Sequence, residues 1–134
     1  VHPNVDPADI FVRENNKTYV NFEIAMNAYM FGGYPTDEQI YQYSLQNHVT
    51  DTTPPAFIWH GGEDELIYPR NSFMFAEALR EHNIPCELHV FGKGGHGLGL
   101  ANEVTENNPW EVNEQCAGWP KLAADWIKSI LRQQ

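Results

Sequence analysis

The strongest constraint on the fold is an alternation of short apolar runs and helical segments that fills residues 51–134. Residues 56–59 (AFIW) form a wholly apolar run, which follows two prolines that disfavour a helix and stops at a glycine turn. Residues 87–91 (ELHVF) form a second short run, which is followed by the glycine-rich loop 92–99. Such runs are typical of strands that are covered on both faces of a parallel sheet.

Two amphipathic helices accompany the predicted strands. The first begins after Pro69, ends before Ile84-Pro85 and connects the two strands. Its buried side is predicted to contain Phe73, Ala76, Leu79 and either Met74 or Ala78. The second has Pro120 near its first turn and follows the spacing i, i+3, i+4, i+7, with an apolar face of Trp119, Leu122, Ala123, Trp126, Ile127, Ile130 and Leu131. This order predicts an α/β fold, in which helices pack on a parallel sheet through right-handed crossovers.

Residues 1–50 differ from the rest, because they are polar and aromatic and contain no convincing buried strand. A helix is predicted over residues 18–31, ended by two glycines, with Phe22, Ala25, Met26 and Tyr29 on one face. A second helix is predicted to begin at Thr36, whose hydroxyl caps it while Gln39 bonds back. Its inward face would contain Ile40, Tyr43 (or Tyr41) and Leu45. We therefore expect a helical, cap-like segment over residues 1–50 and a sheet core over residues 51–134.

Composition and charge exclude several classes of function. The 134 residues, 42% of them hydrophobic, are enough for one packed domain. A formal net charge of −10 argues against a nucleic acid or an anionic membrane surface as partner, because both are bound through basic patches. No apolar run approaches the ~20 residues of a membrane-spanning helix, and no segment resembles a signal peptide. Since Cys86 and Cys116 form no disulfide framework, we interpret them as free thiols and expect a cytoplasmic location.

Two loops are predicted to bring chemically useful side chains to one edge of the sheet. The carboxyl ends of parallel strands meet at that edge, and the predicted strands are followed by Asp64 in loop 60–64 and by His96 in loop 92–97. A carboxylate that holds one imidazole nitrogen leaves the other nitrogen free to take a proton from a nucleophile. We therefore predict that Asp64 orients His96, with Glu63 as the nearest rival for the acid.

The same residues carry a resemblance to a known family. Residues 53–64 (TPPAFIWHGGED), Ile67-Tyr68-Pro69, the run 87–91 and residues 95–98 (GHGL) resemble the last two strands and their loops in the α/β-hydrolase superfamily. The likeness is to the esterase/lipase branch, near acetyl-esterase, feruloyl-esterase-like and dienelactone-hydrolase relatives. It implies that residues 51–134 are the C-terminal part of an α/β-hydrolase sheet and that Asp64 and His96 are the acid and the base of a catalytic triad. Residues 1–50 match only by analogy with a helical cap.

One part of the family pattern is absent from these 134 residues. The nucleophile of such enzymes is a serine in a G-x-S-x-G turn upstream of the acid and the histidine. Ser44, Ser72 and Ser129 lie in predicted helices and in no such motif, and the oxyanion-hole loop is missing as well. The resemblance thus implies the C-terminal portion of a serine carboxylesterase of small acyl esters, with the nucleophile upstream and with no metal or organic cofactor. The isolated chain is predicted to be inactive.

Several alternatives stay open at this point. His60 and His89 are interpreted as structural, and no paired spacing of His or Cys residues favours a metal site. The glycine-rich loop lacks the G-K-[ST] ending of a phosphate-binding loop. Two parallel strands need neighbours, so we expect the missing N-terminal half of the same protein, or a homo-oligomer, to cover the exposed sheet edge. The alternative is a non-catalytic truncated domain or interaction module that associates with another chain through that edge.

Overall fold

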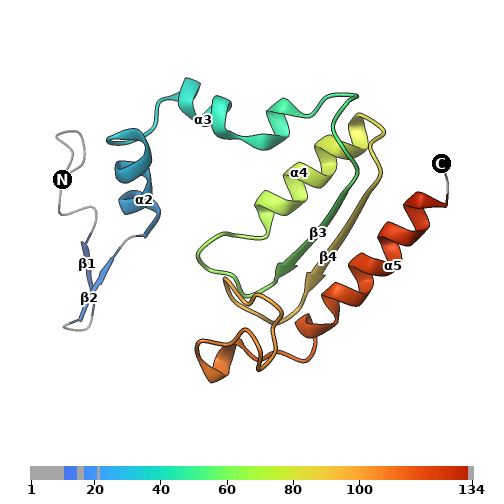
Figure 1. Cartoon of the computed structure of the whole chain (residues 1–134). Coiled ribbons are helices and arrows are strands. Elements are labelled where there is room, and N and C mark those ends of the chain that lie inside the picture. The colour runs from blue at the N-terminus through green and yellow to red at the C-terminus, as the bar shows by residue number, and fades with distance from the viewer. Residues whose placement is uncertain (1–10, 15–16, 21, 133–134) are drawn as a thin grey trace. The chain divides into compact units, whose positions relative to one another are not determined.

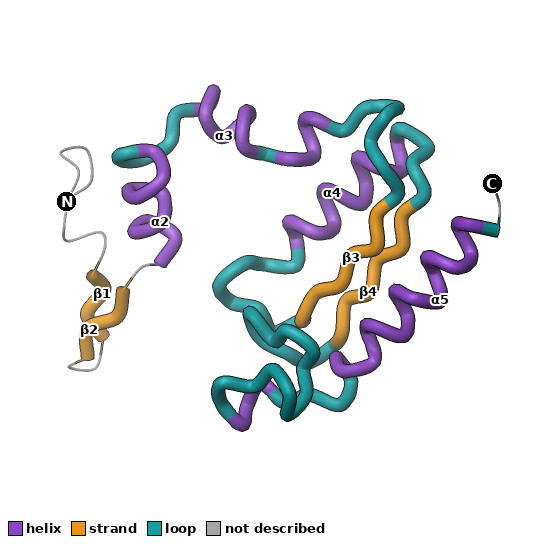
Figure 2. The backbone as a smooth tube through the Cα atoms, in the orientation of Figure 1, coloured by secondary structure: helices purple, strands orange, loops and turns teal. Residues whose placement is uncertain are grey.

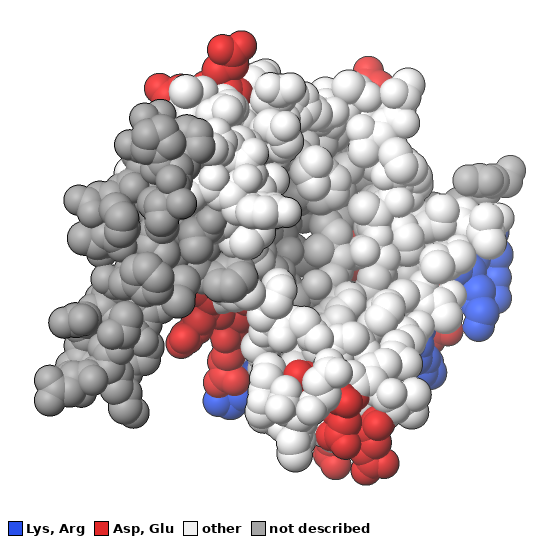
Figure 3. All heavy atoms as spheres, turned by 60° about the vertical axis from the view of Figure 1, so that its left-hand side comes forward, with Lys and Arg blue, Asp and Glu red and all other residues white. Residues whose placement is uncertain are grey.

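The computed structural model describes residues 11–14, 17–20 and 22–132. The chain divides into two compact units, Val1–Asn47 and His48–Gln134, and we describe each by itself. Among the described residues, no helix is long and apolar enough to cross a membrane. The face drawn in Figure 3 carries groups of acidic side chains and few basic ones, as the net charge of −10 requires.

The first unit contains a short hairpin that the sequence analysis did not predict. Strands β1 (Phe11–Glu14) and β2 (Lys17–Val20) pair antiparallel, with Phe11 opposite Val20. Helix α2 (Phe22–Phe31) follows, so the helix predicted over residues 18–31 begins four residues later than expected. The sequence shows no convincing buried strand here, because two four-residue strands are too short to give a clear alternating pattern.

Helix α3 (Asp37–Tyr43) begins as predicted. The hydroxyl of Thr36 accepts the backbone N–H of Gln39 at 3.2 Å, and the side-chain oxygen of Gln39 accepts the N–H of Thr36 at 2.9 Å, which confirms the capping box. The predicted inward face is wrong, because Ile40 and Tyr43 are more than half exposed and no residue of α3 is buried. The 3₁₀ turn η1 (Leu45–His48) follows.

The second unit contains the predicted sheet. Strands β3 (Ala56–Gly61) and β4 (Cys86–Phe91) are parallel, with Ala56 opposite Cys86, and helix α4 (Arg70–Glu81) connects them. Helix α5 (Trp119–Leu131) follows β4 after a long loop. Figures 1 and 2 show the two strands side by side, with α4 on one side of them and α5 on the other. The α/β fold and its β-α-β-α order are confirmed.

The core of this unit is small and consists of two clusters. Where α4 meets the sheet, its residue Leu79 is fully buried beside Ala78 and Val49. Ile58 of β3 and Phe75 of α4 pack against these residues. The predicted buried side of α4 is wrong in one respect, since Phe73 is half exposed. The second cluster lies under the loop after β4 and contains Leu98, Ala101 and Cys116, with Trp59 and Phe91 packed against it.

Helix α5 covers its face of the sheet through two tryptophans. Trp119 stacks on Trp59 with ring centroids 5.4 Å apart, and Trp126 lies 6.0 Å from Phe57. The last apolar residue of the predicted face, Leu131, is exposed. The helix thus occupies the predicted position, but no residue of its predicted face is fully buried.

The loop between β4 and α5 contains two 3₁₀ turns, η2 (Pro109–Glu111) and η3 (Cys116–Gly118). The buried carboxylate of Glu111 accepts the backbone N–H of Asn107 at 2.7 Å and the side-chain amide of Asn108 at 3.2 Å. These hydrogen bonds hold the pKa of Glu111 below its ordinary value, with the N–H of Asn107 contributing most. The loop that leads away from His96 is therefore ordered by its own polar contacts.

Candidate active site

The loops after β3 and β4 lie against each other at the carboxyl ends of the strands. The N–H of Gly62 donates to the carbonyl of Phe91 at 2.7 Å, and the N–H of Glu63 donates to the carbonyl of Gly94 at 3.0 Å. A Cβ atom on Gly61 would lie 2.3 Å from that same carbonyl oxygen, a distance that no side chain tolerates. The approach of the two loops therefore requires glycine at position 61.

This approach brings Asp64 and His96 into contact. Nδ1 of His96 lies 2.9 Å from Oδ2 of Asp64. Because an ionised carboxylate only accepts hydrogen bonds, Nδ1 is the donor, and in the neutral ring Nε2 is left with a free lone pair. The Asp64 side chain is 6% exposed, whereas that of His96 is 49% exposed. The arrangement is therefore a buried acid that holds an accessible imidazole.

The turn after Asp64 fixes its other oxygen. Oδ1 accepts the backbone N–H of Leu66 at 3.0 Å and that of Ile67 at 2.8 Å. Burial alone would raise the pKa of Asp64, but the N–H of Ile67, the ring of His96 and the N–H of Leu66 together hold that pKa below the ordinary 3.8. Asp64 is therefore ionised at neutral pH.

The neighbouring acid, Glu63, has different partners. One of its oxygens accepts from Nζ of Lys93, and the other lies 3.4 Å from the N–H of Gly94. The hydrogen bond from Lys93 is the main cause that lowers the pKa of Glu63. Of the two candidate acids, Asp64 is the one bonded to the ring of His96, and Glu63 instead ties the two loops together at the surface.

His60, interpreted from the sequence as a structural residue, also touches Asp64. Its Nε2 lies 3.2 Å from Oδ2 of Asp64, and its Nδ1 lies 2.7 Å from Oγ of Ser72. The sequence signal was present but weak, since His60 ends the strand that leads into the acid loop. The other histidine of the sheet, His89, instead bonds to Glu87 at 2.7 Å and lies beside the ring of Phe57.

The three serines have hydrogen-bond partners other than His96. Oγ of Ser44 donates to the carbonyl of Ile40 at 2.6 Å, and Oγ of Ser129 donates to that of Trp126 at 2.7 Å. Ser72 is bonded to His60. Within the second unit, the structure therefore does not bring Ser72 or Ser129 onto the free nitrogen of the candidate base.

A shallow hollow of about 180 Å³ opens beside the acid and the imidazole. It is lined by the end of β3 and by the glycine-rich loop: Trp59, His60, Gly61, Asp64, Gly95, His96, Gly97, Leu98 and Gly99. Four of these lining residues are glycines, and three of the four come from the loop that carries His96. Space for a small group therefore exists directly beside the candidate base.

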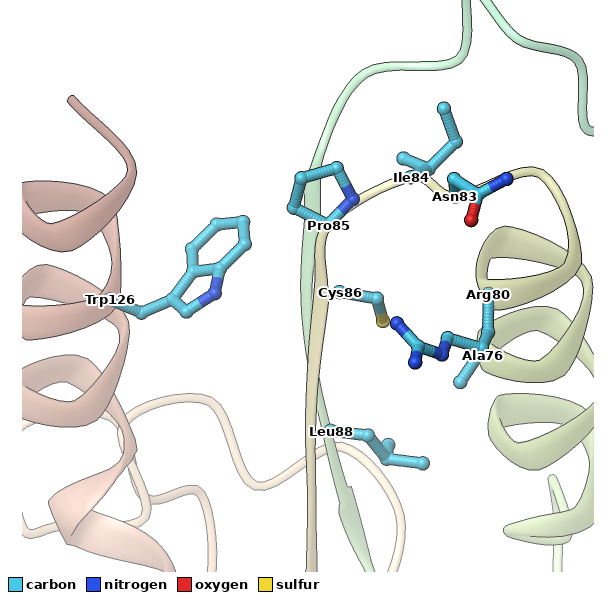
Figure 4. A pocket seen from close by; sticks show the side chains of 8 residues that line it. All are labelled: Ala76, Arg80, Asn83, Ile84, Pro85, Cys86, Leu88 and Trp126. Atoms are coloured by element: carbon cyan, nitrogen blue, oxygen red, sulfur yellow. The ribbon is translucent and has the colours of Figure 1, made fainter. Parts of the chain in front are cut away.

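A larger groove of about 400 Å³ lies at the other end of β4. Figure 4 shows Trp126 pointing toward β4 from α5, while Ala76 and Arg80 come from α4. Cys86 lies in this groove, but burial, aided by the charge of Glu87, raises the pKa of its thiol. A protonated thiol is a poor nucleophile, so this groove offers no equivalent of the chemistry at His96.

A metal centre has no support in the described part of the chain. No three of its His, Cys, Asp or Glu residues come together as a ligand set. The thiol of Cys116 is buried and its pKa is raised by that burial, and the thiol of Cys86 is also unpaired. The candidate chemistry of the described residues is therefore that of the pair Asp64 and His96.

Comparison with known proteins places this geometry in a family. The model of the prolyl oligopeptidase family matches residues 11–113, which is most of the chain. The chain belongs to the prolyl oligopeptidase family. The solved structures similar to this family member include an α/β-hydrolase, a carboxylesterase and an acetyl ester-xyloside hydrolase, so the resemblance to the esterase branch of the α/β-hydrolases is confirmed.

Two solved structures and one curated protein show the range of its relatives. A carboxylesterase from Lactobacillus plantarum is 32% identical over 96% of the chain, with a TM-score of 0.66. An acetyl ester-xyloside bifunctional hydrolase from Caldicellulosiruptor lactoaceticus is 37% identical over 74% of the chain, with a TM-score of 0.62. The endo-1,4-beta-xylanase B of Butyrivibrio fibrisolvens is 47% identical over 74 residues, 55% of the chain.

This member of the prolyl oligopeptidase family spans only part of each relative. It covers 42% of the carboxylesterase, 33% of the bifunctional hydrolase and 12% of the xylanase. The matched relatives thus contain further chain beyond the segment that corresponds to these 134 residues.

The close approach of the two loops can be tested at Gly61. We expect Gly61→Ala to lower the free energy of unfolding by about 1–3 kcal/mol, because the added methyl group would force the two loops apart. Gly92→Ala is the matched control, since a Cβ there meets no atom within 4 Å, and it should change stability by less than about 0.5 kcal/mol. Urea unfolding followed by circular dichroism measures both. Equal effects of the two variants would contradict the loop contact.

The ionisation of Asp64 gives a pH-dependent prediction. Because its pKa is lowered on folding, the carboxylate stabilises the fold above pH ~4, and this contribution is lost as the pH falls through the folded-state pKa. The difference in unfolding free energy between the wild type and Asp64→Asn should therefore be constant above pH ~5 and shrink below pH ~4. Urea unfolding of both chains from pH 7 to pH 3 measures it. A difference that stays constant over this range would show that Asp64 is not ionised as described.

Proposed function

We propose that this chain supplies the acid and the base of a serine carboxylesterase that hydrolyses small acyl esters. A serine from outside these 134 residues attacks the ester carbonyl, and Nε2 of His96 takes its proton. Asp64 holds the ring through Nδ1 and stabilises the imidazolium that forms. His96 then gives the proton to the leaving alcohol, and the serine keeps the acyl group. In a second cycle water attacks this acyl group and releases the carboxylic acid product. The observation that carries this proposal is the 2.9 Å contact between His96 and the buried, ionised Asp64.

Exposure supports the division of roles between the two residues. Asp64 is buried and has no route to a substrate, which suits a residue that orients and stabilises charge. His96 is half exposed, and Nε2 is not used by the contact with Asp64. The hollow of about 180 Å³ beside the ring gives room for the approach of a nucleophile and a carbonyl group. A metal or an organic cofactor is not needed for this chemistry.

The substrate class follows from the relatives and stays a proposal. Two of them are named as a carboxylesterase and as an acetyl ester-xyloside hydrolase. We therefore favour short acyl esters, with acetylated xylosides as the first natural substrates to test. The net charge of −10 disfavours polyanionic substrates, since their approach would be repelled. The cytoplasmic location expected from the sequence also stays a prediction.

The free edges of the sheet support a partner from the same protein. With only two strands in this sheet, the outer edges of β3 and β4 lack a neighbouring strand among the described residues. Apolar side chains of the second unit, such as Ile127 and Leu131, are exposed. The N-terminal half of the same enzyme, carrying the nucleophile, would supply further strands and cover. A homo-oligomer, or a non-catalytic module that binds another chain by this edge, is the alternative.

The roles of the pair can be tested with the protein encoded by the complete gene. We expect His96→Ala and Asp64→Asn each to lower kcat for p-nitrophenyl acetate by about 10³–10⁴-fold, because the general base is lost or misplaced. His82→Ala is the matched control, since His82 bonds to Asp51 at 2.9 Å on an exposed surface and should keep full activity. Steady-state kinetics measure all three. Activity that survives in His96→Ala would remove this residue from the mechanism.

The absence of an activated serine can be tested on the 134-residue chain. A fluorophosphonate probe labels serines that are activated by an adjacent base, and we expect no labelling above that of denatured chain. The protein from the complete gene is the positive control and should be labelled at a serine outside these residues. Mass spectrometry locates the modified residue. Labelling of Ser72, the serine bonded to His60, would contradict the proposed source of the nucleophile.

A further inference from the structure

Both ring nitrogens of His60 are engaged inside the protein. The side chain is 12% exposed and comes from the end of β3. Its Nε2 lies 2.7 Å from the carbonyl oxygen of Ile67 and 3.2 Å from Oδ2 of Asp64. Its Nδ1 lies 2.7 Å from Oγ of Ser72, in the first turn of α4. The ring is therefore a link between a helix, a strand end and the turn that carries the candidate acid.

The partners of His60 determine which nitrogen carries the proton. A carbonyl oxygen only accepts hydrogen bonds, and so does the ionised carboxylate of Asp64. Nε2 faces both, so it must be the donor. In the neutral ring Nδ1 is then an acceptor, and the hydroxyl of Ser72 donates to it. The carbonyl of Ile67 and the carboxylate of Asp64 thus select the Nε2–H tautomer, and the hydroxyl of Ser72 fits it by donating to Nδ1.

His60 also closes the turn that holds Asp64. The N–H of Ile67 donates to Oδ1 of Asp64, while the carbonyl of the same residue accepts from His60. His60 therefore contacts the first and last residues of this turn, Asp64 and Ile67. Oδ1 is fixed by backbone N–H groups, and Oδ2 lies between two imidazole nitrogens, that of His60 and that of His96. The orientation of Oδ2 toward His96 is set by donors on both sides.

We propose that His60 and Ser72 are positioning residues for the pair formed by Asp64 and His96. They extend it into a hydrogen-bonded chain in which Ser72 orients His60, His60 orients Asp64, and Asp64 orients His96. Both ring nitrogens of His60 are already bonded within the protein, so we infer that it acts through the carboxylate of Asp64. Its effect on catalysis rests on the proposed esterase function, whereas its effect on Asp64 is a property of these residues alone.

The order Ser72, His60, Asp64 also has the composition of a catalytic triad, but its geometry differs. In a triad, the acid holds Nδ1 of the histidine, and the nucleophile bonds to Nε2, which faces the substrate. Here Nε2 of His60 is shared between Asp64 and the carbonyl of Ile67, and the ring is nearly buried. The exposed imidazole of the group is that of His96. Ser72 and His60 therefore support the pair formed by Asp64 and His96.

The first test is made by NMR on the 134-residue chain and needs no activity. Long-range ¹H–¹⁵N spectra should show His60 as the Nε2–H tautomer. His60→Leu removes a donor to the charged form of Asp64, so the pKa of Asp64 should rise. His60→Gln keeps an N–H near the position of Nε2 and should restore at least half of that shift. An unchanged pKa of Asp64 in His60→Leu, or no restoration by glutamine, would overturn the positioning role.

The second test uses the protein from the complete gene. We expect His60→Leu to lower kcat about 10- to 100-fold with little change in KM, because a misdirected acid loosens the base without altering substrate contacts. His60→Gln should recover most of kcat, and Ser72→Ala should lose about 3- to 10-fold. His82→Leu and Ser129→Ala are the matched controls and should keep wild-type kcat. A loss that falls on KM instead, or equal losses in the leucine and glutamine variants, would overturn the proposal.

The two tests separate failure of this inference from failure of the proposed function. An enzyme in which His96→Ala stays fully active refutes the esterase roles, and the titration of Asp64 in the chain still decides whether His60 positions the carboxylate. If His96 is essential and the titration shows no effect of His60, the esterase function stands and the positioning role is refuted.

Discussion

The candidate site depends on one buried carboxylate that is surrounded by N–H donors. Burial of an ionised group is unfavourable unless hydrogen bonds replace its water. Asp64 has two backbone N–H groups at Oδ1 and two imidazole nitrogens at Oδ2. These four donors come from the turn after β3, from the end of β3 itself and from the loop after β4. The charge of Asp64 therefore requires these three segments to stay together, and this links the fold to the proposed chemistry.

The backbone meets this requirement because side chains are absent where the loops touch. At Gly61, any Cβ atom would strike the carbonyl of Gly94. At Gly94 the backbone has φ of +107°, and a Cβ there would lie 2.8 Å from Sγ of Cys116. Both positions tie the glycine-rich loop to its surroundings and set where His96 lies. The glycine-rich loop thus owes its position, and with it that of the imidazole, to these close contacts.

Much of this arrangement was predictable, because it is encoded in short-range patterns. The two apolar runs, the capping residues Thr36 and Gln39 and the periodic apolar face of the last helix act over a few residues and were found. The pairing of Asp64 with His96 was found because the carboxyl ends of parallel strands must meet. The buried side of α4 was misplaced, since Phe75 rather than Phe73 packs on the core, and the helical period alone does not fix which face meets the sheet.

The role of His60 was missed for a different physical reason. A histidine has no pattern of its own, and its function depends on which groups the folded backbone brings to its two nitrogens. Those groups are the carbonyl of Ile67, the carboxylate of Asp64 and the hydroxyl of Ser72, which three different segments supply. Strands β1 and β2 were missed for a similar reason. Each has only four residues, and their pairing depends on the register with a partner segment, which a short pattern does not reveal.

The hydrophobic core of the second unit is small. Hydrophobic stabilisation increases with the apolar area that is buried, and few large apolar side chains of this unit are fully buried, Leu79 among them. In contrast, Phe73, Val90 and Ile127 are each at least a third exposed. A parallel sheet is normally covered on both faces and extended at its edges. Further strands and helices that cover these exposed surfaces would therefore add stability to the unit.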